Sequence, residues 1–218
     1  MQRRVVLPGE QIEERKGRKL GSNVYPENDN VFSKVLGIPK VNENEISVIP
    51  LAGVYLPKIG DGIIGKILEV EISGWSVDIN SPYMAFLHLA EAVDEFVDTS
   101  RTDLSIYYTI GDVIFCKISK VTKNKVIQVS MADRNAKKLY KGNMIKITPS
   151  KVPRIIGKDG SMINLIKNKT GCEIIVGQNG VVWLRDGNQP KAIEAILAIE
   201  KKSHIVGLTE KIEKMLGE

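Results

Sequence analysis

The chain has 218 residues, of which 43% are hydrophobic and 26% are charged, close to the averages for globular proteins. The 31 lysines and arginines exceed the 26 aspartates and glutamates by a modest net charge of +5. These values exclude a chain that is disordered or collagen-like throughout, and no apolar run approaches the roughly 18–20 residues of a membrane helix. The two cysteines, Cys116 and Cys172, lack the spacing of a metal or redox motif and fit a reduced intracellular compartment. With two histidines as further ligands, we expect no metal site, no cofactor, no membrane association and a cytoplasmic protein.

The first 58 residues consist of short apolar segments separated by proline, glycine and polar residues. The composition of residues 21–25 and 31–36 is typical of strands. Residues 39–41 and 46–49 flank a polar turn, which predicts a hairpin. Because no stretch has the period of an amphipathic helix, residues 1–58 are expected to form a small all-β domain.

Residues 59–135 predict a second β-domain, because β-branched and aromatic residues recur there in short segments. The predicted strands span residues 63–72, 75–79, 85–89, 113–118 and 126–130. An acidic segment, residues 91–104, separates the third strand from the fourth. Five strands with a gap at that place are typical of a five-stranded OB barrel.

Residues 140–218 change to a mixed pattern in which apolar residues also recur at helical spacing. The predicted elements are a strand at 144–147, a short helix at 153–156, a helix around 162–166, strands at 172–176 and 181–184, and helices near 190 and 209. Their order is β-α-α-β-β-α with one further helix at the end. The whole chain is therefore expected to be mainly β, with an α+β C-terminal part.

A Gly-x-x-Gly loop lies between the first two helices of this C-terminal part. Glycines lack a Cβ and let the backbone approach a sugar-phosphate, while the following helix directs free N–H groups at phosphate oxygens. A KH domain clamps about four nucleotides in this way. The predicted RNA contacts of this region are Lys151, Arg154, Gly157, Lys158, Asp159 and Gly160.

An alternative interpretation is that Gly157 and Gly160 only permit a tight corner between two helices. Asp159 departs from the neutral or basic residue that often occupies this position in such loops. Its negative charge opposes phosphate contact, unless its carboxylate caps the next helix.

The predicted barrel offers a second nucleic-acid surface. OB folds bind ligands on the face formed by strands two and three, and on two loops, one between strands one and two and the other between strands four and five. Here those loops are Ser73–Gly74 and Lys123–Asn124. The candidates for base stacking are Trp75, Tyr83 and His88, and the candidates for phosphate contact are Lys120, Lys123 and Lys125. The alternatives are a core position for Trp75, a plain strand position for His88, and lysines that are merely solvated.

Charge is distributed unevenly along the chain. Residues 117–169 contain fourteen lysines and arginines and two acids, a local net charge of +12, so the remainder sums to −7. Such a bipolar molecule can offer one face to a polyanion and another to a basic protein.

Several short motifs resemble known RNA-binding domains. Five motifs resemble the S1-type OB domain: Gly65-Lys66-Ile67, Gly74-Trp75, Phe86-Leu87-His88-Leu89, Gly111-Asp112-Val113 and Ile127-Gln128-Val129-Ser130. Residues 142–206 resemble a KH domain. Those similar to the N-terminal β-domain of exosome cap proteins are Leu7-Pro8-Gly9-Glu10, Tyr25, Ser33-Lys34-Val35-Leu36-Gly37 and Val48-Ile49-Pro50-Leu51. The order of the three domains resembles the RNA-binding cap subunits of the archaeal exosome, which are related to the eukaryotic ribosomal RNA-processing protein four.

This resemblance implies domains at residues 1–58, 59–135 and 140–218, with the first docking on a ring of phosphorolytic exoribonuclease subunits. It also implies that three copies sit on a hexameric ring and guide the 3′ end of single-stranded RNA inward without doing chemistry. Ser76 stands where many S1 domains carry an aromatic residue, so contact between lysines and the RNA backbone is expected to outweigh stacking.

Three other functions remain open from the residues. The first is an S1/KH RNA-binding factor of translation or transcription. The second is a metal-dependent ribonuclease, whose carboxylates would come from the segment Glu91–Asp103, with Asp94 and Asp98 on one face. The third is an assembly scaffold whose basic stretch binds an acidic protein.

Overall fold

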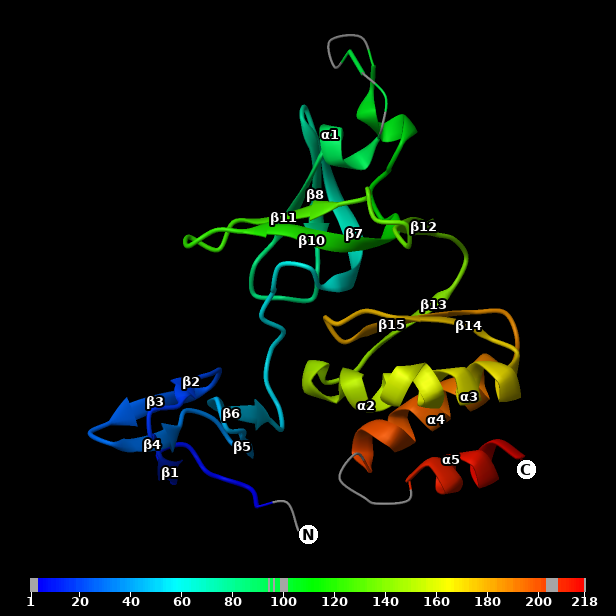
Figure 1. Cartoon of the computed structure of the whole chain (residues 1–218). Coiled ribbons are helices and arrows are strands. Elements are labelled where there is room, and N and C mark those ends of the chain that lie inside the picture. The colour runs from blue at the N-terminus through cyan, green and yellow to red at the C-terminus, as the bar shows by residue number, and fades with distance from the viewer. Residues whose placement is uncertain (1–3, 94, 96, 99–101, 203–207, 218) are drawn as a thin grey trace. The chain divides into compact units, whose positions relative to one another are not determined.

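The computed structural model describes residues 4–93, 95, 97–98, 102–202 and 208–217 (Figure 1). The chain divides into two compact units, residues 1–53 and residues 54–218. Each unit has hydrophobic core residues of its own. In the described part of the chain, no helix is long and apolar enough to cross a lipid bilayer.

The first unit is a β-domain with two three-stranded sheets. Its strands are β1 (Gln11–Glu14), β2 (Lys19–Leu20), β3 (Val24–Glu27), β4 (Asn30–Ser33), β5 (Gly37–Val41) and β6 (Glu45–Pro50). β4 is the central strand of one sheet and β6 of the other. Val24 and Val31 from the first sheet and Ile46 and Val48 from the second join Val6 in one buried cluster.

The predicted hairpin in this unit is confirmed as β5 and β6, which pair from Gly37–Pro50 to Val41–Ile46. The strand predicted at residues 21–25 is too long at its start, since β3 begins at Val24. β1 and β2 were not predicted. β1 is almost entirely polar and β2 has two residues, so neither carries a periodic apolar signal.

The predicted barrel is confirmed in the second unit. Its strands are β7 (Gly62–Glu71), β8 (Gly74–Asp78), β9 (Ala85–His88), β10 (Val113–Val121) and β11 (Ile127–Ser130). The strand order is β11-β9-β8-β7-β10, and pairing of β10 with β11 closes the barrel. A short helix, α1 (Leu89–Ala92), and a 3-10 turn, η1 (Leu104–Ile106), lie between β9 and β10. One more strand, β12 (Lys137–Leu139), pairs with the edge of β10 and was not predicted.

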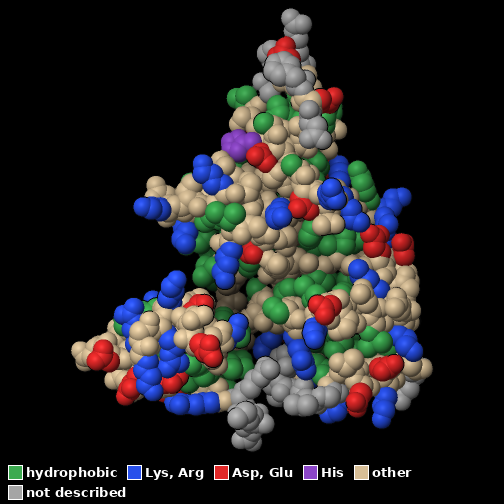
Figure 2. All heavy atoms as spheres, viewed as in Figure 1, with side chains coloured by type: hydrophobic (Ala, Val, Ile, Leu, Met, Phe, Trp, Pro, Cys, Tyr) green, Lys and Arg blue, Asp and Glu red, His purple; other side chains and the backbone are tan. Residues whose placement is uncertain are grey.

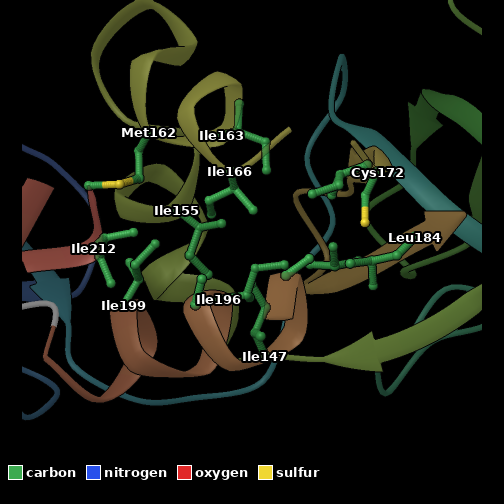
Figure 3. Packing of buried hydrophobic residues seen from close by; sticks show 14 of the residues in the cluster. Ile147, Ile155, Met162, Ile163, Ile166, Cys172, Leu184, Ile196, Ile199 and Ile212 are labelled. Atoms are coloured by element: carbon green, nitrogen blue, oxygen red, sulfur yellow. The ribbon is translucent and has the colours of Figure 1, made fainter. Parts of the chain in front are cut away.

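The C-terminal part has the predicted β-α-α-β-β-α order. Its elements are β13 (Asn143–Lys146), η2 (Pro149–Lys151), α2 (Val152–Ile156), η3 (Lys158–Gly160), α3 (Ser161–Thr170), β14 (Glu173–Val176), β15 (Val181–Arg185), α4 (Gln189–Lys201) and α5 (Leu208–Gly217). β15 is the central strand of the antiparallel sheet β13-β15-β14. Figure 3 shows the core of this domain, where Ile155 of α2, Ile166 of α3 and Ile196 of α4 point toward one another.

The same sheet also contacts the barrel. Val182 and Leu184 of β15 belong to the helical core, whereas the alternate residues Val181 and Trp183 cluster with Ile64 of β7. Leu139 of β12 completes that second cluster. Strand β15 is therefore buried on both faces, and this explains why its first four residues, 181–184, are all apolar.

The loop between β14 and β15 holds the barrel through the side chain of Asn179, which is fully buried. Its Nδ2 donates to the main-chain oxygens of Ile64, at 2.7 Å, and Ile79, at 2.9 Å. Its Oδ1 accepts from the N–H of Ile64 at 3.3 Å, and its main-chain oxygen accepts from Nδ2 of Asn80 at 2.9 Å. One amide thus satisfies main-chain groups on β7 and immediately after β8 that would otherwise be buried without partners.

We expect Asn179→Ala to destabilise the second unit by about 1–3 kcal/mol, because buried carbonyl oxygens of Ile64 and Ile79 would lose their donor. For a unit of this size the melting temperature should fall by about 2–4 °C per kcal/mol. Thermal and urea unfolding measure the change. Gln178→Ala is the matched control, since Gln178 is exposed and donates to Gly62 through its main-chain N–H. Equal melting temperatures for the two variants would contradict this role of Asn179.

Candidate nucleic-acid interface

The outer face of β8, β9 and β11 carries a strip of polar and aromatic side chains. Along β9, Ala85 and Leu87 are buried in the barrel, whereas Phe86 and His88 alternate with them and are partly exposed. Strand register places Phe86 opposite Ser76 of β8 and opposite Gln128 of β11. These side chains share the face on which OB folds bind their ligands.

The rings of Phe86 and His88 meet edge to face, with centroids 4.6 Å apart and planes at 71°. His88 Nε2 lies 2.9 Å from Nε2 of Gln128, so the imidazole contacts the Phe86 ring and hydrogen-bonds with the Gln128 side chain. Phe86 was not among the predicted site residues. The alternation of buried and exposed residues in 85–88 is the signal that could have identified it.

Trp75 is a correction to the sequence-based prediction. Its side chain is fully buried in the barrel core, its Nε1 donates to the main-chain oxygen of Tyr108 at 2.9 Å, and its ring packs edge to face on the Tyr108 ring. Because β8 alternates, the inward place of Trp75 puts Ser76 on the outer face instead. The indole therefore has no free face for a base, and the aromatic side chains that β9 leaves partly exposed on the outer face are Phe86 and His88.

The hairpin between β10 and β11 carries the three lysines predicted to contact phosphates, and all three are exposed. Lys120 pairs with Gln128 across the two strands and therefore lies beside the Phe86–His88 strip. Lys125 Nζ lies 5.9 Å from the centroid of the partly buried Tyr83 ring, which brings two predicted site residues together. Figure 2 shows lysine and arginine side chains gathered at the projecting tip of this hairpin, where Lys123 is located.

The Gly-x-x-Gly loop joins α2 to α3. Gly157 has φ 76° and ψ 176°, and a Cβ there would lie 2.7 Å from the main-chain nitrogen of Met162, so only glycine fits. Lys158 and Asp159 are both exposed on the turn, and Gly160 has φ 78°. The loop therefore presents a lysine and a carboxylate beside bare backbone.

The proposed capping role of Asp159 is wrong. The residue adopts φ 53° and ψ 28°, and the helix α3 starts after Gly160; among the described residues no side chain caps it. The Asp159 carboxylate is thus exposed on the loop without a capping role, where it opposes phosphate contact. Lys151, which is partly exposed at the end of η2, and Arg154, which is exposed on α2, precede the loop in the same segment.

Some of the basic residues in segment 117–169 have a structural role. Lys117 pairs with Asp133 at 3.2 Å, and Lys137 pairs with Glu173 at 2.9 Å. The backbone N–H of Asn135 and then Lys117 lower the pKa of Asp133, so this carboxylate stays ionised beside its lysine. The charge available to a polyanion therefore lies elsewhere in the segment.

Metal ligation has no candidate in the described residues, where no group of at least three His, Cys, Asp or Glu side chains converges. Asp94, which the ribonuclease alternative required, lies outside the described residues. Cys116 and Cys172 are free and buried, and burial raises the pKa of the Cys116 thiol to about 12.

Three family models match successive parts of the chain. They are the Exosome RNA binding protein RRP4 N-terminal domain at residues 3–52, the RRP4 S1 domain at residues 54–103 and the KH domain at residues 142–190. Their order is the one expected from the sequence motifs.

Curated relatives match over nearly the whole length. The "Exosome complex component Rrp4" of Pyrococcus furiosus is 44% identical over 98% of this chain and 83% of that protein. The protein of the same name from Picrophilus torridus is 41% identical over 98% of this chain and 92% of that one. A crystal structure described as a candidate exosome complex RNA-binding protein is 32% identical, with a TM-score of 0.69 over 76% of this chain and 96% of that chain. With this identity over 98% of the chain and all three domain models in order, the chain belongs to the Rrp4 family of exosome components.

Proposed function

We propose that this protein is the non-catalytic RNA-binding cap subunit of an exosome, which recruits single-stranded RNA and guides its 3′ end into a ring of phosphorolytic exoribonucleases. The curated relatives are named as exosome components, and the matching crystal structure is described as an RNA-binding protein. The observation on which the proposal rests most heavily is the outer barrel face, where Phe86 and His88 lie beside the lysine hairpin.

This face suits single-stranded RNA of any sequence. A partly exposed aromatic ring can stack with an unpaired base, and lysines neutralise the backbone without reading base identity. Ser76 provides no second aromatic ring opposite Phe86, so stacking is limited and phosphate contact by Lys120, Lys123 and Lys125 supplies more of the affinity. Weak sequence preference follows. The Gly-x-x-Gly loop, with Lys151, Arg154 and Lys158, adds a second phosphate contact from the C-terminal domain.

The partners that this function requires are single-stranded RNA and the ring subunits. We infer three copies on a hexameric ring in the cytoplasm, with the N-terminal domain of residues 1–58 docked on the ring and the barrel of residues 59–135 at its entrance. Adding the purified chain to ring subunits should yield a complex that degrades long single-stranded RNA faster than the ring does alone. Failure to co-elute with the ring on size exclusion would contradict this assignment and favour a separate S1/KH factor.

Removing the aromatic ring at position 86 should weaken RNA binding. Stacking of one base on an aromatic side chain contributes about 1–3 kcal/mol, so Phe86→Ala should raise the Kd by about fivefold or more. Fluorescence anisotropy with labelled oligouridylate at low salt measures this change. Ile106→Ala is the control, since that apolar side chain is 68% exposed and belongs to η1, outside the strands β8, β9 and β11 that carry the strip. Equal affinities for both variants would exclude the barrel face as a stacking site.

The lysine hairpin should determine much of the salt dependence. Replacing Lys120, Lys123 and Lys125 with alanine should reduce the slope of log K against log salt by about 0.7 for each phosphate that these lysines neutralise in the wild type. The control variant replaces Lys201, Lys211 and Lys214, three exposed lysines on α4 and α5, and has the same net charge. A slope that changes equally in both variants would show that only total charge matters. The same titration with Lys158→Glu separates the Gly-x-x-Gly loop from the barrel.

A further inference from the structure

A second group of basic residues remains outside the surfaces described so far. Lys138, Lys141 and Lys146 lie on or between β12 and β13, the segment that joins the barrel to the C-terminal domain. Two large side chains on the same segment are exposed, Tyr140 at 59% and Met144 at 43%. We call residues 138–146 the connector surface. In Figure 2, lysine and arginine side chains lie next to apolar side chains at the edge of the barrel formed by β12.

The Tyr140 ring is held in place by a fixed cation. Lys138 Nζ lies 5.6 Å from the centroid of Tyr140 and 5.7 Å from that of Tyr108, so the ammonium stands between two aromatic rings. The same ammonium pairs with the carboxylate of Asp112. Tyr108 in turn packs on the buried Trp75, which anchors the group in the barrel core.

The Asp112 carboxylate remains charged in this arrangement. Partial burial alone would raise its pKa, but hydrogen bonds from Lys138 and from the main chain of Thr109 outweigh it, and the pKa is lowered. Lys138 is therefore largely neutralised by its partner, and its role is to orient the rings. Lys141 and Lys146, both exposed, supply the positive charge of the connector surface.

The backbone of the connector is equally constrained. A Cβ at Gly142 would collide with the indole of Trp183, so this part of the chain lies directly on a buried ring. Met144 pairs with Trp183 across β13 and β15. A surface held in this way loses little conformational entropy when a ligand binds, which favours binding.

An exposed aromatic ring flanked by lysines is the combination that binds single strands, with a base on the ring and phosphates on the ammonium groups. An acidic protein segment would use the lysines but has no need of the ring. The connector surface and the lysine hairpin lie at opposite ends of β10, since Val113–Phe115 pair with β12 whereas Lys120 and Val121 lead into the hairpin. At about 3.3 Å per residue these ends are separated by roughly 25 Å.

We propose that the connector surface is a second single-stranded RNA contact, in which Tyr140 stacks on one base while Lys141 and Lys146 neutralise phosphates. This inference rests on the proposed RNA-binding function and extends it to a site distinct from the barrel face and the Gly-x-x-Gly loop. An RNA that reaches both ends of β10 binds more tightly than one confined to the barrel face.

The test compares two labelled oligouridylates, one of about 4 nucleotides, the lower end of the site size of one OB fold, and one several times longer. Tyr140→Ala in the full chain should raise the Kd for the long RNA by about fivefold or more and the Kd for the short RNA much less. Tyr140→Phe keeps the aromatic ring and should bind both RNAs with the affinity of the wild type. Photo-crosslinking of 5-iodouridine RNA followed by mass spectrometry should identify Tyr140 as an attachment site.

A double variant, Lys141→Ala with Lys146→Ala, should reduce the salt slope by about 0.7 per neutralised phosphate, unlike Lys211→Ala with Lys214→Ala on α5. Melting curves establish that each variant is folded. If Tyr140→Ala and the double lysine variant bind the long RNA as the wild type does while Phe86→Ala weakens it, the connector surface does not bind RNA and the proposed function stands. If the wild-type chain binds neither RNA, both the proposed function and this inference fail.

Discussion

The buried amide of Asn179 links two domains that each have a separate hydrophobic core. Its donors and acceptor satisfy main-chain groups of Ile64 and Ile79, and the neighbouring cluster of Ile64, Leu139, Val181 and Trp183 excludes water from these bonds. A hydrogen bond in such surroundings is directional, whereas apolar contact alone allows two domains to slide. The barrel and the C-terminal domain are therefore held in one orientation, and an RNA that reaches from one to the other must follow a path fixed by that constraint.

The same joint explains which surfaces remain available to a ligand. Because β15 contributes alternate residues to two cores, the central strand of the C-terminal sheet is covered on both faces, and exposed residues of this sheet lie on its edge strand β13. The turn at Gly157–Gly160, the outer face of β9 and the connector between β12 and β13 remain accessible. Each carries or adjoins positive charge, and each lies on an element that is fixed by a core.

Basic residues near one another in sequence serve different purposes in this fold. Lys117 and Lys137 are held by Asp133 and Glu173, and Lys138 orients two tyrosine rings. Lys120, Lys123 and Lys125 extend from a hairpin into solvent. Part of the positive charge of segment 117–169 therefore serves the fold, and the lysines and arginines outside those pairs supply the charge that can attract a polyanion.

Local signals in the sequence were enough to predict the domain order, the barrel strands, the β-α-α-β-β-α pattern and the Gly-x-x-Gly turn, because periodicity, turn residues and glycine spacing can be read within one segment. They did not reveal β1, β2 or β12, which are short or polar and exist only through pairing with neighbours. Nor did they show that Trp75 is buried while Phe86 faces outward, since either could be inward until the barrel closes and sets the register. The structural role of Asn179 was also hidden, because its partners lie about a hundred positions earlier in the chain. These points depend on the tertiary structure, since burial and long-range hydrogen bonding are properties of the folded chain and not of any segment within it.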